Sequence, residues 1–410
     1  MNYKMAYINN MSKDNVSSLI QTPNSLRTHI AIFGKPNSGK SSLINKITGQ
    51  NVSIVSPVEG TTTDPVKKTM EIKNLGPCLF IDTAGINDVS CLGDLRNKKT
   101  LEVINQIDMA IVLINALDFE EELEFIKKIH DVSKVIVINK IDILEPDYLN
   151  ELEKKIFEKT NLKPIKISAQ ENINIDVLIN NLVKIKPYQE TSIVGDLVHH
   201  GDFVLLVMPQ DIQAPQGRLI LPQVQIIRDL LDNKTIVTCV TKENFLDALK
   251  ILNQNLKLII TDSQIFNFIA KNTPKNIKIT SFSILLARYK GDIKEFKKGA
   301  DYIDELKPDS KILIAKACTH VPLDEDIGRV KIPRLLKNYL GFDLKIEFSR
   351  GNNFPEDLSQ YDLIIHCGAC MFNKKFMLSR INQAKKQNIN ITNYGLAIAK
   401  LNNMLDKIYF

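Results

Sequence analysis

The sequence predicts an α/β fold, with a phosphate-binding domain followed by two smaller α/β units. Short apolar runs of strand length alternate with helical stretches along most of the chain, a pattern that favours parallel sheets covered by helices. A glycine-rich loop of the phosphate-binding type directly follows the first of these runs. Two groups of cysteines and histidines follow two of the last runs, which places them at the sheet edge where open α/β proteins bind ligands.

The bulk composition is typical of a multidomain globular protein. The chain has 410 residues, of which 44% are hydrophobic and 24% are charged, enough for two or three domains. It contains no run of about 18 apolar residues, so we expect no membrane span. Its net charge of +6 comes from lysines spread along the chain, so nucleic acid is not indicated as a partner. Six cysteines are too few for a disulfide scaffold, which favours a cytoplasmic protein.

Four segments are expected along the chain. Residues 1–27 contain no apolar stretch of secretory type and are expected to form a flexible tail. A nucleotide-binding domain is expected at residues 28–188, a small α/β domain at 189–275 and a last α/β domain at 276–410. The apolar strands that define these domains are expected at residues 30–33, 78–81, 110–114, 134–138, 164–167, 202–208, 235–240, 311–315 and 362–365.

Some apolar positions are expected to be core. Val224, Ile227 and Leu231 recur at helical spacing in the middle domain, and such a stripe more often packs inside a protein than at an interface. Cys78 and Cys239 fall within apolar strands. We expect both cysteines to be small core residues.

The phosphate-binding loop spans residues 34–41 and reads GKPNSGKS, which matches the pattern G-x-x-x-x-G-K-[ST] between a strand and a helix. In this pattern backbone N–H groups turn toward the phosphates, Lys40 reaches the β- and γ-phosphates, and the Ser41 hydroxyl binds Mg²⁺. The residues expected around the phosphates are Gly34, Asn37, Ser38, Gly39, Lys40, Ser41 and Ser42.

Two further segments complete the expected catalytic set. Asp82 and Gly85 follow the second strand, where the carboxylate would support the magnesium ion and the glycine N–H would meet the γ-phosphate. Between them and the phosphate-binding loop, residues 60–64 read GTTTD, and a threonine there could close over Mg²⁺ when the triphosphate is bound. Thr62 is favoured for this role, with Thr61 and Thr63 as alternatives.

The choice of base follows from residues 139–142, which read NKID. Asp142 can accept hydrogen bonds from N1–H and the 2-amino group of guanine, and adenine offers no such pair. Asn139 and Lys140 precede it, and Ser168 and Ala169 follow the next strand, where a backbone N–H can meet guanine O6. The sequence therefore predicts GTP rather than ATP.

These motifs, in this order, make the first domain resemble the TrmE/Era-like family of GTPases. Ile86 stands where Ras-type proteins carry a water-orienting glutamine, so another group must assist hydrolysis. Asn37 resembles the asparagine by which potassium-activated members hold K⁺ against the phosphates, where the cation neutralises charge as an arginine finger does. The alternative is that Asn37 only hydrogen-bonds within its loop.

The C-terminal cysteines and histidines point to a metal. Cys318 begins a C-x-H group, and Cys367 and Cys370 form a C-x-x-C group that follows His366. A C-x-x-C pair alone is more often a redox pair or chance, but the whole set favours a soft metal. Zinc would take four of the five side chains, whereas a 4Fe-4S cluster would use the three thiolates and leave one iron for a weaker ligand. The candidates for that ligand are His320, His366, Asp324 and Glu325.

The combination resembles the HydF family of maturation GTPases for iron-only (FeFe) hydrogenases, on these motifs and on residues 214–225 and 326–333. The resemblance implies that the middle domain dimerises the protein and that the last domain holds a 4Fe-4S cluster on Cys318, Cys367 and Cys370 and supports a tetramer. It also implies a scaffold that receives a diiron precursor as cargo from radical-SAM enzymes and delivers it to apo-hydrogenase. GTP hydrolysis would then be slow and regulatory.

Two other classes of protein share some of these sequence features. A zinc-stabilised GTPase that acts on RNA or the ribosome is favoured by the basic charge and by the first domain's family. A radical-SAM enzyme would need a C-x-x-x-C-x-x-C run, which the sequence lacks.

Overall fold

The computed structural model describes residues 22–49, 66–83, 102–187, 192–209, 219–252, 255–317, 326–351, 353–369 and 372–410. The chain divides into two compact units, Met1–Pro187 and Tyr188–Phe410, and each is described by itself. No helix among the described residues combines the length and apolar character that crossing a membrane requires.

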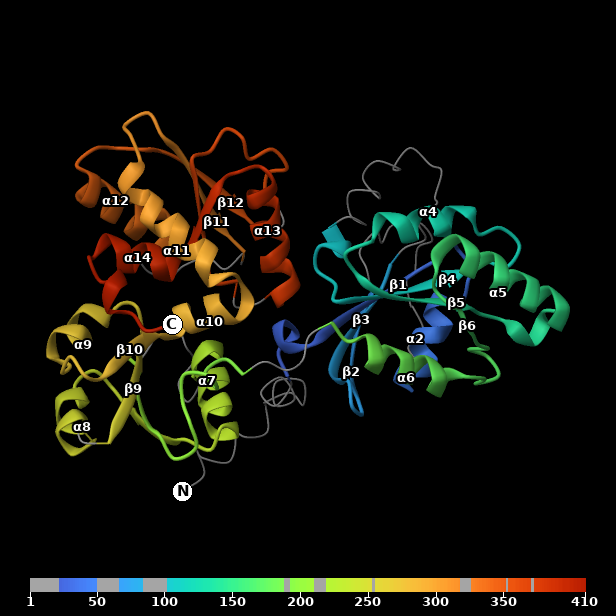
Figure 1. The fold of residues 1–410 in the computed structure, drawn as a ribbon, viewed down its shortest axis with the longest axis horizontal. Helices are drawn as coiled ribbons and strands as arrows, with labels where there is room; N and C mark the ends of the chain where they lie inside the picture. The colour runs from blue at the N-terminus through green and yellow to red at the C-terminus, as the bar shows by residue number, and fades with distance from the viewer. Residues whose placement is uncertain are drawn as a thin grey trace, which may run out of the picture. The chain divides into compact units, whose positions relative to one another are not determined.

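The first unit is built on a six-stranded sheet with the strand order β2-β3-β1-β4-β5-β6 (Figure 1). The strands are β1 (Thr28–Phe33), β2 (Val66–Ile72), β3 (Gly76–Asp82), β4 (Met109–Ile114), β5 (Ser133–Ile138) and β6 (Ile165–Lys166). All neighbours are parallel except β2 and β3, which are antiparallel. The expected parallel sheet is therefore present, with an antiparallel edge strand that the sequence analysis did not anticipate.

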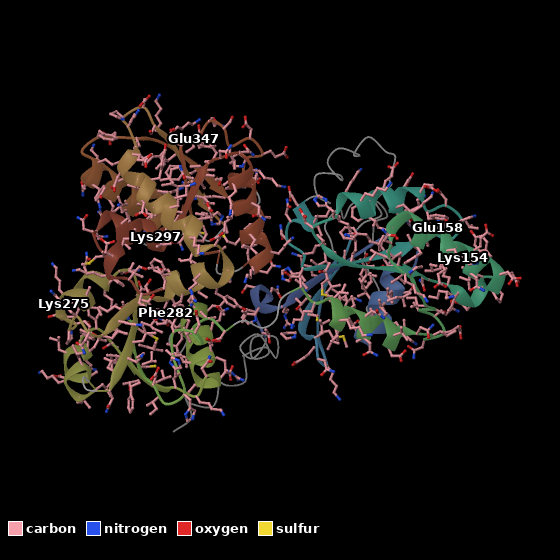
Figure 2. The ribbon with its side chains drawn as sticks, viewed as in Figure 1. Lys154, Glu158, Lys275, Phe282, Lys297 and Glu347 are labelled. Atoms are coloured by element: carbon pink, nitrogen blue, oxygen red, sulfur yellow. The ribbon has the colours of Figure 1, made fainter. Side chains whose placement is uncertain are left out.

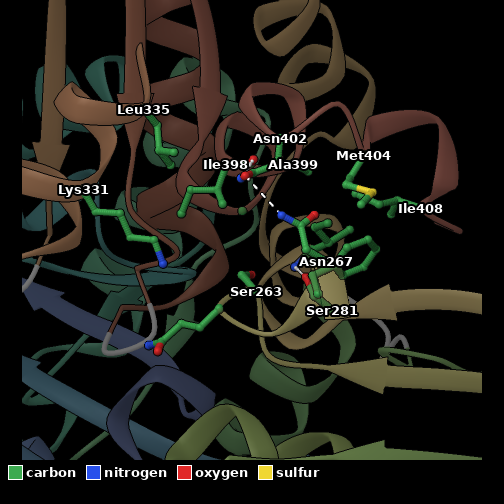
Figure 3. Close-up of a pocket in the computed structure, with 14 residues that line it drawn as sticks. Ser263, Asn267, Ser281, Lys331, Leu335, Ile398, Ala399, Asn402, Met404 and Ile408 are labelled. Atoms are coloured by element: carbon green, nitrogen blue, oxygen red, sulfur yellow. Dashed lines mark hydrogen bonds between the residues drawn. The ribbon is translucent and has the colours of Figure 1, made fainter. Parts of the chain in front are cut away.

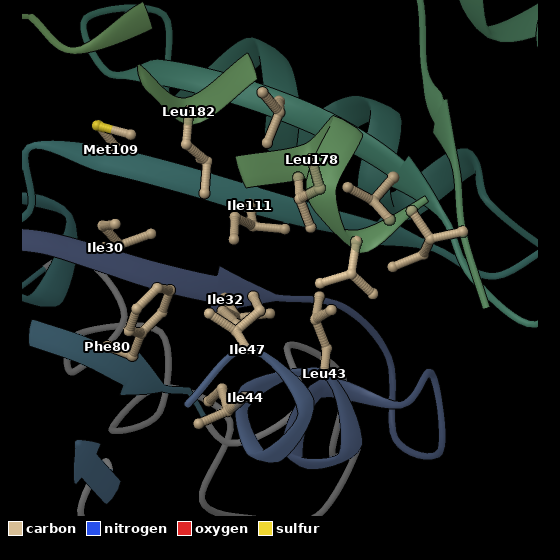
Figure 4. Close-up of a cluster of buried hydrophobic side chains, with 14 of the residues drawn as sticks. Ile30, Ile32, Leu43, Ile44, Ile47, Phe80, Met109, Ile111, Leu178 and Leu182 are labelled. Atoms are coloured by element: carbon tan, nitrogen blue, oxygen red, sulfur yellow. The ribbon is translucent and has the colours of Figure 1, made fainter. Parts of the chain in front are cut away.

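Helices cover both faces of this sheet because its central strands are apolar on both sides. Ile30 and Ile32 of β1 pack in one cluster with residues of α2 (Lys40–Thr48) and α6 (Ile175–Ile185) (Figure 4). The alternate β1 residues pack in a second cluster with α4 (Glu120–Lys128) and α5 (Pro146–Thr160). Successive side chains of a strand point to opposite faces, so an uninterrupted apolar run needs cover on both.

Helix α5 shows how a surface helix meets this requirement. Leu149, Leu152 and Ile156 recur at helical spacing and are buried, whereas Lys154 and Glu158 lie on its exposed side (Figure 2). Pro146 opens the helix at a position where its missing N–H costs nothing. Asn161 ends it in the left-handed conformation, with its N–H bonded to the Phe157 carbonyl.

The second unit contains two parallel four-stranded sheets. The middle sheet has the order β10-β9-β7-β8, and the C-terminal sheet has the order β12-β11-β13-β14. The strands are β7 (Phe203–Val207), β8 (Ile236–Val240), β9 (Leu256–Thr261), β10 (Lys278–Ser281), β11 (Lys311–Lys316), β12 (Lys345–Arg350), β13 (Leu363–His366) and β14 (Asn390–Asn393). The helices are α7 (Leu221–Asp232), α8 (Phe245–Leu252), α9 (Phe266–Asn272), α10 (Phe282–Lys290), α11 (Ile293–Asp301), α12 (Ile332–Leu340), α13 (Lys374–Lys386) and α14 (Tyr394–Leu401).

Helix α10 lies between the two sheets of the second unit (Figure 1). Phe282, Leu285 and Leu286 pack into the core of the middle sheet, and Ile284 and Ala287 pack into the core of the C-terminal sheet. Ser281 caps the helix by accepting a hydrogen bond from the Ile284 N–H. One helix therefore belongs to both cores, and the middle sheet extends past the expected domain end at residue 275 to β10.

The expectations for single apolar residues had different outcomes. Cys78 is fully buried, as predicted, but Cys239 is exposed because β8 is an edge strand. The prediction for α7 was wrong for two of its three residues, while Ile227 is partly buried and packs against the core of the middle sheet. Val224 and Leu231 are 48% and 55% exposed, and the buried residues of the helix include Ile226 and Leu230. The fold therefore covers the side of α7 that carries Ile226 and Leu230, with Ile227 at its border, and leaves Val224 and Leu231 exposed.

Candidate nucleotide and metal sites

The phosphate-binding loop joins β1 to α2 and needs glycine at two positions. Gly34 has a φ of 152° and Gly39 a φ of 93°, values that residues with a Cβ rarely adopt. A Cβ on Gly34 would lie 2.8 Å from both the Leu113 carbonyl oxygen and Ser38 Oγ. The loop can therefore pass close to β4 and present its backbone N–H groups only because glycine stands there.

Lys40 lies inside this loop. Its side chain is 9% exposed, and Nζ donates to the carbonyl oxygens of Gly34 at 2.8 Å and Lys35 at 2.9 Å. Burial lowers the pKa of Lys40, while the charges of Asp82 and Glu122 oppose this shift. A buried ammonium held by neutral carbonyls is an environment that favours an anionic group such as a phosphate.

Ser41 and Asp82 meet at the start of α2. Ser41 Oγ donates to Asp82 Oδ2 at 2.7 Å, and Thr83 Oγ1 donates to the Ile32 carbonyl at 2.7 Å, which fixes the end of β3 beside β1. A hydroxyl and a carboxylate that lie side by side suit Mg²⁺, because this ion takes oxygen ligands and retains several of its waters. Two of the residues predicted for this ion are therefore adjacent in the structure, and the third, Thr62, lies outside the described residues.

Asn139 connects the three loops expected around the nucleotide. Its side chain is 6% exposed, Nδ2 donates to the Ser38 carbonyl at 3.0 Å, and Oδ1 accepts from the Ala169 N–H at 3.1 Å. Lys140, with a φ of 62°, adds a bond from Nζ to the Asn37 carbonyl at 2.8 Å. Asn139 thus holds the phosphate loop and the base loops together, a positioning role that its place in the NKID motif did not reveal.

Asp142, Ser168 and Asn37 have different surroundings. Asp142 is exposed in a short helical turn, η2 (Ile141–Ile143), where its carboxylate is accessible to a base. Ser168 is fully buried, and its Oγ accepts from the Glu171 N–H at 3.1 Å, which fixes the turn before α6. Asn37 is exposed and has a φ of 62°, a left-handed conformation that asparagine tolerates better than most residues.

One acidic residue near the phosphate loop was missed by the sequence analysis. Glu122 of α4 is 1% exposed, and its carboxylate lies 3.9 Å from Lys35 Nζ. Burial raises the pKa of Glu122, and Lys35 opposes this shift. Lys35 also pairs with Asp118 at 2.5 Å. The loop is therefore anchored to α4 by its lysine at position 35.

Several predicted site residues lie outside the described part of the chain. They are Thr61, Thr62, Thr63, Gly85, Ile86, Cys318, His320, Asp324, Glu325 and Cys370. Their roles remain predictions from the sequence.

The two strands that precede the cysteine-containing groups in the sequence are neighbours in the C-terminal sheet. β11 and β13 are parallel neighbours, with Ala315 opposite His366. The Cys367 N–H donates to the Ala315 carbonyl at 2.8 Å, and the Ala317 N–H donates to Cys367 Sγ at 3.0 Å. Cys367 therefore lies at the carboxyl edge beside the strand that leads to Cys318, as the sequence analysis expected.

His366 was a candidate iron ligand, and the structure gives its ring other partners. The side chain is fully buried. Nε2 accepts from an Arg380 guanidinium N–H at 2.7 Å, and Nδ1 donates to the Cys367 carbonyl at 2.6 Å. Burial, with a further contribution from Arg380, lowers the pKa of His366 to about 3. Both ring nitrogens are engaged, so this arrangement does not support His366 as a ligand.

Arg380 is a functional candidate that the sequence analysis missed. It is 4% exposed, lies over the rings of Phe354 and Phe376, and donates to the Gly351 carbonyl at 2.5 Å. Burial lowers the pKa of Arg380 to about 10, while Cys367 acts in the opposite direction. Its position on the buried stripe of α13 was the available signal, because a charged residue at such spacing needs a partner inside the protein.

The described surroundings of Cys367 suit a metal group that carries negative charge. Cys367 Sγ accepts a backbone N–H and lies in the electrostatic field of the buried Arg380, and both favour a thiolate. The described residues alone contain no group of three or more potential ligands, since Cys318 and Cys370 lie outside them. A separate cavity of about 120 Å³, lined by Ser263, Lys331 and Asn402 among others, has no cysteine or histidine among its described lining residues (Figure 3).

Three family models match successive parts of the chain. A family model described as 50S ribosome-binding GTPase matches residues 29–140. The hydrogen maturase F dimerization domain matches residues 193–291, and the hydrogen maturase F tetramerization domain matches residues 294–409. These last two matches together span more than half of the chain. The chain belongs to the hydrogen maturase F family. Its first unit is a TrmE/Era-like GTPase domain, and the dimerization and tetramerization domains indicate self-association.

Curated relatives of the chain are GTPases, and each matches less than half of its length. They include the tRNA modification GTPase MnmE of Flavobacterium johnsoniae, 36% identical over 163 residues, which are 38% of this chain and 34% of the relative. GTPase Der of Mycoplasmopsis agalactiae is 34% identical over 45% of this chain and 43% of its own length. GTPase Era of Aquifex aeolicus is 33% identical over 42% of this chain and 60% of its own length.

Solved structures similar to the chain are also GTP-binding proteins. Era of Aquifex aeolicus bound to GDP·AlF4⁻ is 24% identical, with a TM-score of 0.35, over 52% of this chain and 92% of that one. A probable GTP-binding protein engB is 22% identical, with a TM-score of 0.32, over 38% of this chain and 97% of that one. The chain therefore spans only part of the curated relatives and shares only part of its own length with these structures.

Proposed function

We propose that this protein is a cytoplasmic GTP-hydrolysing scaffold that carries a diiron precursor as cargo and delivers it to apo FeFe-hydrogenase. The observation that supports this most is the presence, in one chain, of a GTPase domain and both hydrogen maturase F association domains. Radical-SAM maturation enzymes would supply the precursor. GTP turnover would then be slow and would regulate association with partners or release of the cargo.

In this proposal the first unit binds GTP with Mg²⁺. Lys40 lies inside the phosphate loop, and the adjacent Ser41 and Asp82 offer oxygen atoms to the metal. Asp142 is exposed where it can accept from guanine. Thr62 and Gly85 complete the set as predictions from the sequence.

Potassium is the proposed activating ion of this site. Asn37 is an exposed residue of the phosphate loop. Its backbone is left-handed, and its carbonyl accepts a hydrogen bond from Lys140 Nζ. The amide oxygen of Asn37 can therefore serve as one ligand of a cation beside the phosphates, where such a charge assists phosphoryl transfer.

The C-terminal sheet is proposed to hold a 4Fe-4S cluster on Cys318, Cys367 and Cys370. Cys367 is placed by a strand end, accepts a backbone N–H and lies near a buried guanidinium. When bound, such a cluster supplies an iron atom that can take an exchangeable ligand. His320 and Glu325 are the remaining candidates for that ligand, since the ring nitrogens of His366 are engaged.

Self-association is proposed to use the β8 edge of the middle sheet. β8 ends the order β10-β9-β7-β8, and Ile236 and Cys239 on it are exposed. Val224 and Leu231 of the adjacent α7 are also exposed. An apolar edge of a parallel sheet pairs readily with another strand, so a homodimer formed by two copies of this edge would cover these residues.

Anaerobic purification of the full chain tests the proposal. We expect about four iron and four sulfide per chain, as a single 4Fe-4S cluster requires, and an electron paramagnetic resonance signal after reduction. The signal should be lost in Cys318→Ser, Cys367→Ser and Cys370→Ser, and retained in Cys239→Ser, the control on the exposed edge strand. The protein loaded by its partners should activate apo-hydrogenase. A chain that holds only zinc, or loaded protein that never activates the hydrogenase, would refute the carrier role.

A further inference from the structure

A cavity of about 120 Å³ lies where the two association domains of the chain meet. Its described lining residues between positions 263 and 284 belong to the dimerization match, and those between positions 331 and 408 belong to the tetramerization match. All of them belong to the second compact unit of the chain. The cavity therefore forms only when both domains are folded against each other.

The cavity lies at the carboxyl edge of the middle sheet. β9 ends at Thr261 and its parallel neighbour β10 ends at Ser281. Ser263 and Ser281 line the cavity at these strand ends, and residues of α12 and α14, including Leu335 and Ile398, line it from the C-terminal domain (Figure 3). Because α/β proteins bind small ligands at the carboxyl ends of their parallel strands, the cavity has the position of a binding site.

A chain of serine hydroxyl groups forms one polar part of the lining. Ser283 Oγ lies 2.6 Å from Ser263 Oγ and 3.1 Å from Ser281 Oγ. Three hydroxyl groups carry three protons and these two bonds use two of them, so one proton remains available to donate. Gly395 leaves room for the chain, because a Cβ there would lie 2.6 Å from Ser283 Oγ.

Two side-chain amides border the cavity as well. Asn267 Nδ2 donates to Asn402 Oδ1 at 3.2 Å (Figure 3). Asn402 Nδ2 donates in turn to the Ile398 carbonyl at 2.7 Å. The first bond joins α9 of the dimerization domain to the end of α14 in the tetramerization domain, so it helps to hold the two walls of the cavity together.

The described lining carries one cation and no acid. Lys331 is the last residue of the short helix η4 (Ile327–Lys331). It is half-buried, and its side chain extends toward the cavity (Figure 3). Its ammonium group has no ion pair or hydrogen bond with another described residue, and no Asp, Glu, Arg or His stands among the described lining residues. An anion would therefore replace part of the hydration that this ammonium has lost.

The remaining lining is mostly apolar. Leu335, Ile398, Ala399 and Met404 contribute hydrocarbon surface. A cavity of about 150 Å³ can hold benzene, so one of about 120 Å³ suits a molecule of roughly five or six non-hydrogen atoms. An ion that is polar on every side, such as phosphate, would lose hydration against this surface without compensation. The lining therefore favours an anion that has a hydrocarbon part.

We propose that this cavity binds a small organic carboxylate. The carboxylate group lies against Lys331, and the hydrocarbon part packs against Leu335 and Ile398. Because the ligand contacts both association domains, its binding stabilises their arrangement within the second unit. The inference is independent of the carrier role, since the described lining includes no residue of the nucleotide site or of the proposed cluster.

Titration of the full chain with four small compounds tests the ligand class. Butyrate has the proposed size and charge, butanol is its neutral counterpart, butylamine carries the opposite charge, and inorganic phosphate is an anion without a hydrocarbon part. Isothermal titration calorimetry measures the affinities. We expect butyrate to bind with a dissociation constant of about 1 mM, about tenfold or more below those of the other three compounds. Methyl signals of Ile284, Leu335 and Ile398 in nuclear magnetic resonance spectra should shift on binding, because these residues line the cavity.

Substitutions test the residues. Lys331→Gln should weaken butyrate binding about tenfold, because a hydrogen bond to a charged group is lost, and Lys331→Arg should retain it. Lys337→Gln is the matched control, since it removes the same charge from an exposed lysine of α12 that pairs with Asp343. Ala399→Leu should abolish binding by filling the cavity, with circular dichroism to show that this variant is folded. If it does not fold, Lys331→Gln decides, because that position is half-buried.

Several outcomes would overturn the proposal. Equal affinity for butyrate and butanol, or unchanged butyrate affinity in Lys331→Gln, would show that the lysine does not recognise a carboxylate. Tighter binding of butylamine or phosphate would assign the cavity to another class of ligand. Butyrate shifts confined to methyl groups outside the cavity, or no butyrate binding at about 10 mM, would exclude a carboxylate site here.

Discussion

His366 should remain neutral in the folded protein far below the pH at which a free histidine is protonated. The ring is fully buried, and burial and the Arg380 guanidinium lower its pKa from 6.5 to about 3. In the unfolded chain the ring regains its ordinary pKa. Below pH 6.5 the unfolded state therefore binds a proton that the folded state does not, so this histidine makes the protein less stable as the pH falls.

The size of this effect follows from the shift. One pH unit corresponds to about 1.36 kcal/mol for one proton, and the penalty accumulates between pH 6.5 and about 3. At pH 5, about 1.5 units below the upper limit, His366 should cost the second unit about 2 kcal/mol of its free energy of unfolding. Above pH 6.5 the ring is neutral in both states and the cost disappears.

Nuclear magnetic resonance of histidine-labelled protein measures this directly, since the chain has six histidines. His366→Gln identifies the signal, which should stay at its neutral position from pH 7.5 to pH 4.5, with the exposed histidines as internal controls. In Arg380→Met the pKa of His366 should rise but stay below 6.5, because burial is the larger cause. A His366 signal that titrates near pH 6.5 in the folded wild type would refute this reasoning.

Four further results are expected. Asn139→Ala should lower the free energy of unfolding of the first unit by about 2 kcal/mol, because the Ser38 carbonyl and the buried Ala169 N–H lose their partner; denaturation followed by release of a fluorescent guanine nucleotide measures it. Asp142→Asn should shift preference toward xanthosine triphosphate, and unchanged preference for GTP would remove this residue from the base site. GTP hydrolysis should be at least tenfold faster in K⁺ than in Na⁺ and lose this difference in Asn37→Ala; equal rates in both salts would exclude a potassium site. Ile236→Glu should convert a dimer to a monomer in light scattering, since a charge would enter the apolar edge, whereas a persisting dimer would place the interface elsewhere.

The nucleotide site could be predicted from the sequence because its residues occur in contiguous motifs. The loop at residues 34–41 follows β1, and Asp82 and Asn139 each lie at or beside a strand end of the same sheet. Parallel strands bring their carboxyl ends to one edge, so order along the chain was sufficient to bring these residues together. The same rule placed Cys367 beside the strand that leads to Cys318.

Other contacts could not be predicted because they depend on strand order and helix packing. Cys239 has the neighbours of a core residue in the sequence, yet β8 is an edge strand and exposes it. In α7, Val224 and Leu231 share one apolar face and Ile226 lies on another. Periodicity shows that a helix has apolar faces, but not which of two similar faces the sheet will cover.

The linear order of residues determined the α/β class, the GTPase domain and the position of Cys367 beside the strand that precedes Cys318, because local motifs and parallel strands carry that information. Only the tertiary structure decided that His366 binds Arg380 and that Lys290 donates a hydrogen bond to the carbonyl of Ala369, 79 positions away. Charged residues on helices look like surface residues until packing buries them. Once they are buried, the cost of removing a charge from water makes their few partners specific.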